Sequence, residues 1–249
     1  MWVYIGTSEL KNAYIGEVWT PGSNTVAYYQ LEKDWNDYSG NWHNLTWYWW
    51  TPTYTISWGT KKVVNLNGSI LGKIANLSGT YTNYTFNVWC KPTNNTTTWQ
   101  ELFDNYKDGS SSGSTDNAYI NFNWTSYEKA SAKDFAYQYR PNGWSNAYQN
   151  VYGTTNRATN SWYNVVVTST VSWIKIYVNW TQVASNSTTW TIILDSGYNC
   201  IWGRYRNYYS DYVNRFIGYM SEFIMEDKSR TASEVANYYN STKANYWIS

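Results

Sequence analysis

Two clusters of aromatic residues flanked by polar ones are the residues best suited to contact a ligand. The first cluster consists of Trp47, Trp49 and Trp50, and the second of Tyr205, Arg206, Tyr208 and Tyr209, with Asp211 close behind. The C–H face of a sugar ring stacks on aromatic rings, while its hydroxyls bond to polar side chains. The clusters predict carbohydrate binding. The alternative is that these rings pack into the interior of the protein.

An acidic stretch offers a second kind of chemistry. Its three candidate calcium ligands are Asp104, Asp108 and Asp116, whose carboxylates could surround the ion together with backbone carbonyls. The stretch does not match an EF-hand, because Tyr106 occupies a ligand position. The alternative is a solvated loop, for which calcium would leave the melting temperature unchanged.

The sequence contains no convincing grouping of residues that is typical of an enzyme active site. His43 is the only histidine, which leaves no convincing Ser/His/Asp or Cys/His pairing. Glycoside hydrolysis needs two carboxyl groups roughly 5–10 Å apart. Glu222 and Glu226 would share one face of a strand, but the residue between them on that face is Ile224. We therefore expect no enzymatic activity, and we expect Cys90 and Cys200 to be buried free thiols.

Charge and hydropathy exclude several classes of protein. The 249 residues include 18 Lys and Arg against 17 Asp and Glu, so no basic surface for nucleic acid is expected. No apolar run is long enough to cross a membrane. No signal peptide is visible in the first ten residues. Several Asn-x-Ser/Thr sites are compatible with a protein of the cell or virion exterior.

Short alternating runs rich in aromatic and β-branched residues predict strands almost throughout. The clearest are 84–90, 118–124, 135–139, 162–168 and 174–178. Clusters of Gly, Asn and Ser separate them, so the pattern predicts an all-β, two-sheet antiparallel jelly-roll sandwich. One short C-terminal helix is expected at about 232–243, docked on the edge of the sandwich, because Thr231 and Glu234 form a capping box.

The chain divides into two parts. Residues 1–22 contain the tripeptide Tyr-Ile-Gly twice, beginning at Tyr4 and at Tyr14, and are expected to form an N-terminal arm or tether. Residues 23–249 carry the strand pattern and the helix, and are expected to form one jelly-roll domain.

Several segments, in this order, resemble a known family. They are 27–31, 37–41, 44–46, 86–92, 162–168, 176–179, 216–224 and 229–234. Together they resemble laminin-G-like jelly rolls of the concanavalin A-like lectin/glucanase superfamily. The resemblance implies two stacked antiparallel sheets, a non-catalytic role in binding glycans or proteins, and calcium in some members. The Glu-x-Asp-x-x-Glu run of the superfamily's glucanases is not reproduced, for example at Glu101-Leu-Phe-Asp104.

The chain departs from the family pattern by having tryptophan where glycine is expected. Asn179-Trp180 lies between two strand-like runs, where a two-residue hairpin favours Asn-Gly. Trp42 lies in a similar turn-like stretch. One hypothesis is that some of these positions are glycine in the organism, through a reassigned stop codon that is translated as Trp. The alternative is a surface that is truly rich in tryptophan.

The sequence therefore predicts a non-enzymatic recognition module in a cell-surface adhesin or a phage structural protein. Its partner would be a glycan or a surface protein, with several copies supplying avidity. The rival function is a structural spacer or assembly domain that binds only copies of itself or a larger scaffold.

Overall fold

The computed structural model describes most of the chain after the predicted arm. The described residues are 21–32, 34–48, 52–58, 61–69, 71–95, 99–106, 117–122, 134–140, 149–187, 191–206 and 211–246. The predicted arm, residues 1–22, lies outside this part except for its last two residues. No helix of the described residues is long and apolar enough to cross a membrane.

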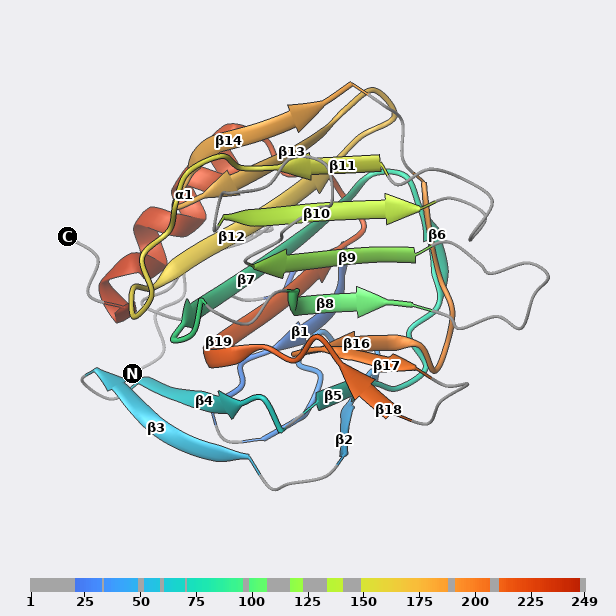
Figure 1. Ribbon diagram of the computed structural model, residues 1–249. Helices are drawn as coiled ribbons and strands as arrows, with labels where there is room; N and C mark the ends of the chain where they lie inside the picture. Colours follow the sequence, from blue (N-terminus) through green and yellow to red (C-terminus); the bar gives the residue numbers. More distant parts are fainter. Residues whose placement is uncertain are drawn as a thin grey trace, which may run out of the picture.

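Two antiparallel sheets stack face to face, as predicted (Figure 1). The eight-stranded sheet has the order β14-β13-β12-β7-β19-β4-β3, and β1 also pairs with β19. Its strands are β1 (Thr25–Tyr29), β3 (Thr53–Trp58), β4 (Lys61–Asn67), β7 (Tyr84–Pro92), β12 (Tyr163–Ser169), β13 (Ile174–Val178), β14 (Thr181–Asn186) and β19 (Ile217–Glu226).

The second sheet has seven strands in the order β11-β10-β9-β8-β16-β5-β2. They are β2 (Leu45–Tyr48), β5 (Leu71–Ile74), β8 (Gln100–Asn105), β9 (Asn117–Phe122), β10 (Phe135–Arg140), β11 (Gln149–Tyr152) and β16 (Asn199–Ile201). Two short ribbons complete the β structure: β6 (Gly79–Tyr81) with β15 (Ile192–Leu194), and β17 (Arg204–Arg206) with β18 (Asp211–Val213).

The core lies between the two sheets and is built from the inward side chains of each alternating strand. Phe86 of β7 packs on Phe103 of β8 with 4.6 Å between ring centroids, and Phe103 stacks on Phe223 of β19 at 5.6 Å. The hydroxyls of Tyr84 and Tyr137 hydrogen-bond to each other across the core at 3.0 Å. Burial of these rings supplies the main stabilisation that holds the sheets together.

Cys90 and Cys200 are both buried free thiols, which confirms that prediction. Each lies in a strand, and burial raises the thiol pKa of both.

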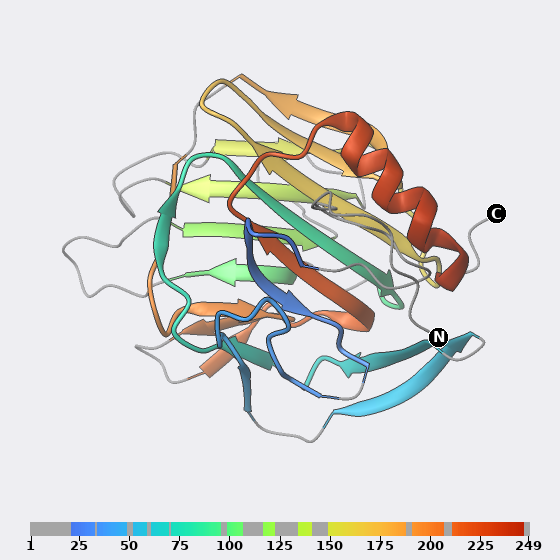
Figure 2. The ribbon, with the colours of Figure 1, turned by 180° about the vertical axis from the view of Figure 1, so that it is seen from behind.

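The predicted helix is present, but it covers a face of the sandwich and not its edge. Helix α1 (Ala232–Thr242) and the short 3-10 helix η2 (Lys243–Tyr246) lie across the outer face of the eight-stranded sheet (Figure 2). Trp89, in the central strand β7, stacks on Tyr246 at 4.0 Å and on Tyr239 at 5.8 Å. The large outward ring of Trp89 explains the difference, because it can be buried only if the helix covers the sheet face.

Four tryptophans of the described residues have a left-handed backbone. Their φ angles are 62° at Trp42, 61° at Trp99, 65° at Trp180 and 75° at Trp202. This region is strongly unfavourable for bulky side chains and is the one that glycine adopts freely. At Trp202 the ring is nevertheless fully buried and donates to the sulfur of Met220 at 2.9 Å.

We predict that Thr231→Ala lowers the free energy of unfolding by about 1 kcal/mol. The Thr231 hydroxyl accepts a hydrogen bond from the Glu234 backbone N–H, and the Glu234 carboxylate accepts one from the Thr231 N–H. Urea denaturation measures the change. Ser241→Ala is the control, because its hydroxyl bonds only to a carbonyl within the helix and its removal should change stability by less than about 0.5 kcal/mol. Equal effects of the two variants would contradict a capping role.

Candidate functional site

The outer face of the seven-stranded sheet carries a transverse row of polar side chains. Cross-strand pairing joins one residue from each strand, and paired residues point to the same face. The row runs through Thr46, Lys73, Cys200, Asp104, Tyr119, Gln138 and Asn150. We call these residues the polar row. Its middle is buried, Thr46 is exposed, and Lys73 and Asn150 are partly exposed.

One half of the row is tied together by side-chain amides. Asn121 follows Tyr119 by two residues in β9 and therefore lies on the same face as the row. Its side chain donates to the Gln138 side-chain oxygen at 3.1 Å. Gln138 in turn donates to the Asn150 side-chain oxygen at 2.9 Å. These bonds satisfy polar groups that would be costly to bury alone.

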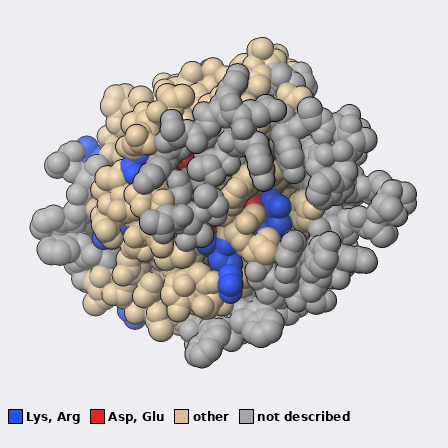
Figure 3. Space-filling view, in the orientation of Figure 1, with Lys and Arg blue, Asp and Glu red and all other residues tan. Residues whose placement is uncertain are grey.

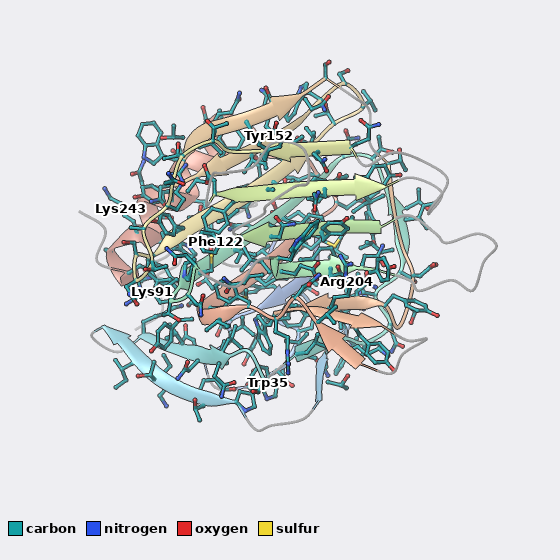
Figure 4. The ribbon with its side chains drawn as sticks, in the orientation of Figure 1. Trp35, Lys91, Phe122, Tyr152, Arg204 and Lys243 are labelled. Carbon is teal, nitrogen blue, oxygen red and sulfur yellow. The ribbon has the colours of Figure 1, made fainter. Side chains whose placement is uncertain are left out.

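The other half of the row is organised by Arg204 of β17. Its Nη2 lies 2.7 Å from Oε1 of Glu101, and its Nε lies 2.9 Å from Oδ2 of Asp104. The guanidinium also lies 4.3 Å and 4.8 Å from the ring centroids of Tyr106 and Tyr119. Figure 4 shows Arg204 beside β8, where the β17–β18 ribbon meets the sheet. We call Arg204, Glu101 and Asp104 the charged trio.

Both carboxyl groups of the charged trio are fully buried. Burial raises the pKa of Glu101 well above its ordinary value, against the opposing effect of Arg204, and the negative charge of Asp104 raises it further. The Asp104 pKa is also raised by burial. Oε2 of Glu101 and Oδ1 of Asp104 have no donor from another residue. The directions of these pKa shifts predict that the two carboxyl groups share one proton, which would leave one negative charge opposite Arg204.

The neighbouring residue of β17, Tyr205, is partly exposed at the end of the polar row. The Lys73 Nζ lies 5.3 Å from the centroid of the Tyr205 ring. The Thr46 hydroxyl donates to the Lys73 backbone carbonyl at 3.3 Å. An ammonium group therefore lies over an aromatic ring near the edge of the sheet, and the Thr46 hydroxyl is bonded to the backbone of the same lysine. Figure 3 shows basic and acidic atoms side by side on this face, at the level of β8 and β9.

The structure places some of the residues predicted to bind a ligand and leaves others outside its described part. Tyr205 lies in the site just described. The backbones of Trp47, Arg206 and Asp211 are placed: Trp47 pairs with Gly72 in β2 and β5, and Arg206 pairs with Asp211 in the ribbon. Strand β2 therefore pairs with β5, and Lys73 of β5 lies near Tyr205 of the ribbon. Trp49, Trp50, Tyr208 and Tyr209 lie outside the described residues.

Of the candidate calcium ligands, only Asp104 is described, and it pairs with Arg204. Asp108 and Asp116 fall outside the described residues. Within the described part of the chain, no three His, Cys, Asp or Glu side chains come together as a metal site would require.

Sequence reasoning missed Lys73, Thr46 and the charged trio as parts of one site. Arg204 is separated from Glu101 by 103 residues, and the contact depends on β16 lying next to β8. The available signal was the polar residue facing outward in each successive strand, which becomes informative only when the order of the strands is known.

We predict that Glu101→Gln makes the protein more stable than the original chain at neutral pH, by a difference that grows with pH. Because the folded pKa is raised, the native state keeps a proton that the unfolded chain releases above about pH 4.5. The free energy of unfolding then falls as pH rises, by up to about 1.4 kcal/mol per pH unit, until the folded pKa is reached. Glutamine does not titrate. Parallel stability curves for the two proteins from pH 4 to pH 8 would contradict the shared proton.

Comparison with known proteins agrees with this architecture. The family model described as the concanavalin A-like lectin/glucanases superfamily matches residues 66–236. A search of the curated protein sequences finds no match. Among solved structures, domain 4 of the extracellular arabinanase AbnA of Geobacillus stearothermophilus, in complex with arabinotriose, is similar with a TM-score of 0.66 and 17% identity. That match covers 86% of this chain and 98% of the other.

Two bacterial toxin domains are also similar. The binding domain of paraclostridial mosquitocidal protein 1 has a TM-score of 0.60 at 17% identity, covering 88% of this chain and 52% of that one. The ligand-binding domain of botulinum neurotoxin serotype D, in complex with N-acetylneuraminic acid, has a TM-score of 0.60 at 15% identity, covering 87% and 50%. At these identities the likeness concerns the fold. With its two stacked antiparallel sheets and a family match over most of its length, the chain belongs to the concanavalin A-like lectin/glucanases superfamily.

Proposed function

We propose that this protein is a non-enzymatic recognition module that binds carbohydrate at the edge of the seven-stranded sheet. The observation that carries the proposal is the position of the Lys73 ammonium next to the Tyr205 ring, with the Thr46 hydroxyl bonded to the same β5 residue. The ring offers a stacking face, and the ammonium and hydroxyl can bond to sugar hydroxyls.

The backing of Tyr205 supports this assignment. Successive side chains of β17 point to opposite sides. Arg204 contacts two carboxyl groups and two aromatic rings on one side, and Tyr205 faces Lys73 on the other. A ring on an anchored strand loses little further freedom when a ligand stacks on it. Such preorganisation increases the net free energy of binding.

The described carboxyl groups favour binding over hydrolysis. Glu101 and Asp104 are buried and paired with Arg204. Glu222 accepts a hydrogen bond from the Tyr238 hydroxyl and pairs with Lys61 at 3.1 Å, beneath helix α1. Glu226 pairs with Arg230. A general acid and a nucleophile must both reach the substrate, and none of these groups is open to one.

Similar domains bind sugars, which also supports the proposal. The arabinanase domain was solved with arabinotriose and the neurotoxin domain with N-acetylneuraminic acid. We extend the proposal to a location on the cell or virion surface, as part of an adhesin or a phage structural protein. Several copies in an assembly would raise the avidity of a modest single site.

We predict that Tyr205→Ala weakens glycan binding by roughly fivefold or more, equivalent to about 1 kcal/mol for a lost aromatic contact. A glycan array that includes arabino-oligosaccharides and sialosides identifies the ligand, and titration calorimetry measures the affinity. Lys73→Ala should weaken binding of the same ligand. The matched control is Lys175→Ala, because Lys175 lies 4.2 Å from the Trp173 ring in a similar pair on the other sheet. An array without hits, together with self-association in sedimentation, would instead favour the assembly function.

We also predict that Trp47→Ala combined with Trp50→Ala abolishes the array signal if the first aromatic cluster contributes to the same surface. Within β2, Thr46 pairs with Lys73, whereas Trp47 pairs with Gly72 at the alternate register position, so the double variant tests whether the first cluster reaches the ligand. Circular dichroism checks that the double variant folds. Unchanged binding by a folded double variant would remove the first cluster from the site.

A further inference from the structure

We infer that residues 42 and 180 are glycine in the protein as its organism makes it, and that a reassigned stop codon translated as tryptophan accounts for the rings at these positions. The inference rests on the backbone of the described residues. It changes which aromatic side chains are available to a ligand.

The kinds of residue found at positive φ are the first observation. Apart from glycine, these residues are Leu31, four asparagines and four tryptophans. Asparagine is expected there, because its short side chain tolerates the left-handed region. Tyrosine, with 27 residues in the chain against 18 tryptophans, does not occur at positive φ among the described residues. If the positions with positive φ tolerated large aromatic side chains in general, tyrosine would occur there as well. The enrichment is therefore specific to tryptophan.

The turn between β13 and β14 shows what residue 180 has to be. Asn179 and Trp180 are the two loop residues, with φ angles of 49° and 65°. Positive φ at both positions is the type I′ hairpin, for which Asn-Gly is the preferred pair. Asn179 exchanges hydrogen bonds of 2.9 Å with Asn164 through its backbone N–H and its side-chain oxygen, which holds the turn in place. The Trp180 side chain is 53% exposed, so packing does not compensate for the strain.

Hydrogen bonds fix the residues on both sides of Trp42 in its loop. The Asn41 side chain donates to the carbonyls of Thr25 and Val26, both at 2.9 Å. The His43 backbone N–H donates to Asp37 Oδ2 at 3.0 Å. Residue 42 therefore cannot relax to negative φ without breaking these bonds. Its ring is 79% exposed, the largest exposed fraction among the exposed large hydrophobic residues of the described chain.

Trp99 and Trp202 are left out of the inference. Trp99 is partly buried and immediately precedes Gln100, whose side chain bonds to Asn94 at 2.7 Å and to Ile217 at 2.9 Å. Trp202 has the same backbone conformation, but its buried ring packs edge-on against Trp35 at 5.3 Å. Packing can balance the strain there, so φ alone does not decide the residue at 202.

The inference has a consequence for binding. Trp42 and Trp180 are the exposed tryptophans among the large exposed hydrophobic residues of the described chain. As glycines they offer no stacking face, and the aromatic contact proposed at Tyr205 does not depend on them. The inference and the proposed function can therefore fail separately.

Stability measurements test the strain. Trp180→Gly and Trp42→Gly should each raise the urea midpoint, and the matched variants Trp180→Ala and Trp42→Ala should raise it less, because alanine keeps the Cβ that glycine lacks. Glycine is ordinarily the less stable of the two residues, so this order is diagnostic. Trp89→Gly is the control and should lower the midpoint, because that ring is buried under α1. Alanine variants as stable as the glycine variants would overturn the inference.

Peptide mass spectrometry of the protein purified from its source decides the identity of the residues. The peptides that span positions 42 and 180 should have the mass of glycine at these positions, and the peptide that spans Trp89 should have the mass of tryptophan. The reassigned stop codon should occur at 42 and 180, and the ordinary tryptophan codon at 89. Tryptophan in the native peptide at either position would overturn the inference.

Discussion

The candidate surface depends on the ion pairs of Arg204. Burying a charge without a partner is unfavourable, so the Arg204 guanidinium requires the carboxyl pair of Glu101 and Asp104 as its counter-charge. Without Arg204, the buried carboxyl pair would have no counter-charge beneath the ribbon. The short β17–β18 ribbon has little core of its own, and this trio fixes it to the sheet. The orientation of Tyr205 toward Lys73 follows from that attachment.

The two outer faces of the sandwich have different roles. Helix α1 and η2 seal the eight-stranded sheet through Trp89, Tyr238 and Tyr246, and the hydroxyls of both tyrosines are bonded within that face. The seven-stranded sheet carries polar groups across its strands. The aromatic packing of the helix lies on one side and the polar row on the other, so changes at the edge of the seven-stranded sheet need not disturb the helix packing.

Local features of the fold could be predicted from the sequence, and contacts between distant segments could not. Alternation in β7 and β12 identified these strands, and the capping box at Thr231 located the helix start correctly. The helix was expected on the edge, because nothing in a single strand shows which face a neighbour will cover. The charged trio was not expected either, since it joins β8 to β17 through a strand order in which β16 lies between β8 and β5.

The abundance of aromatic residues is therefore weak evidence for a binding surface. Trp89 and Phe86 are buried and contribute to packing, and the rings of Trp42 and Trp180 extend from turns whose backbone favours glycine. A ring contributes to recognition when its strand is anchored and its face is reachable. Among the predicted ligand-binding residues whose side chains the structure describes, Tyr205 is partly exposed on a strand anchored by Arg204, with the Lys73 ammonium beside its ring. The proposed recognition thus rests on an anchored tyrosine and a neighbouring lysine, and does not require exposed tryptophan.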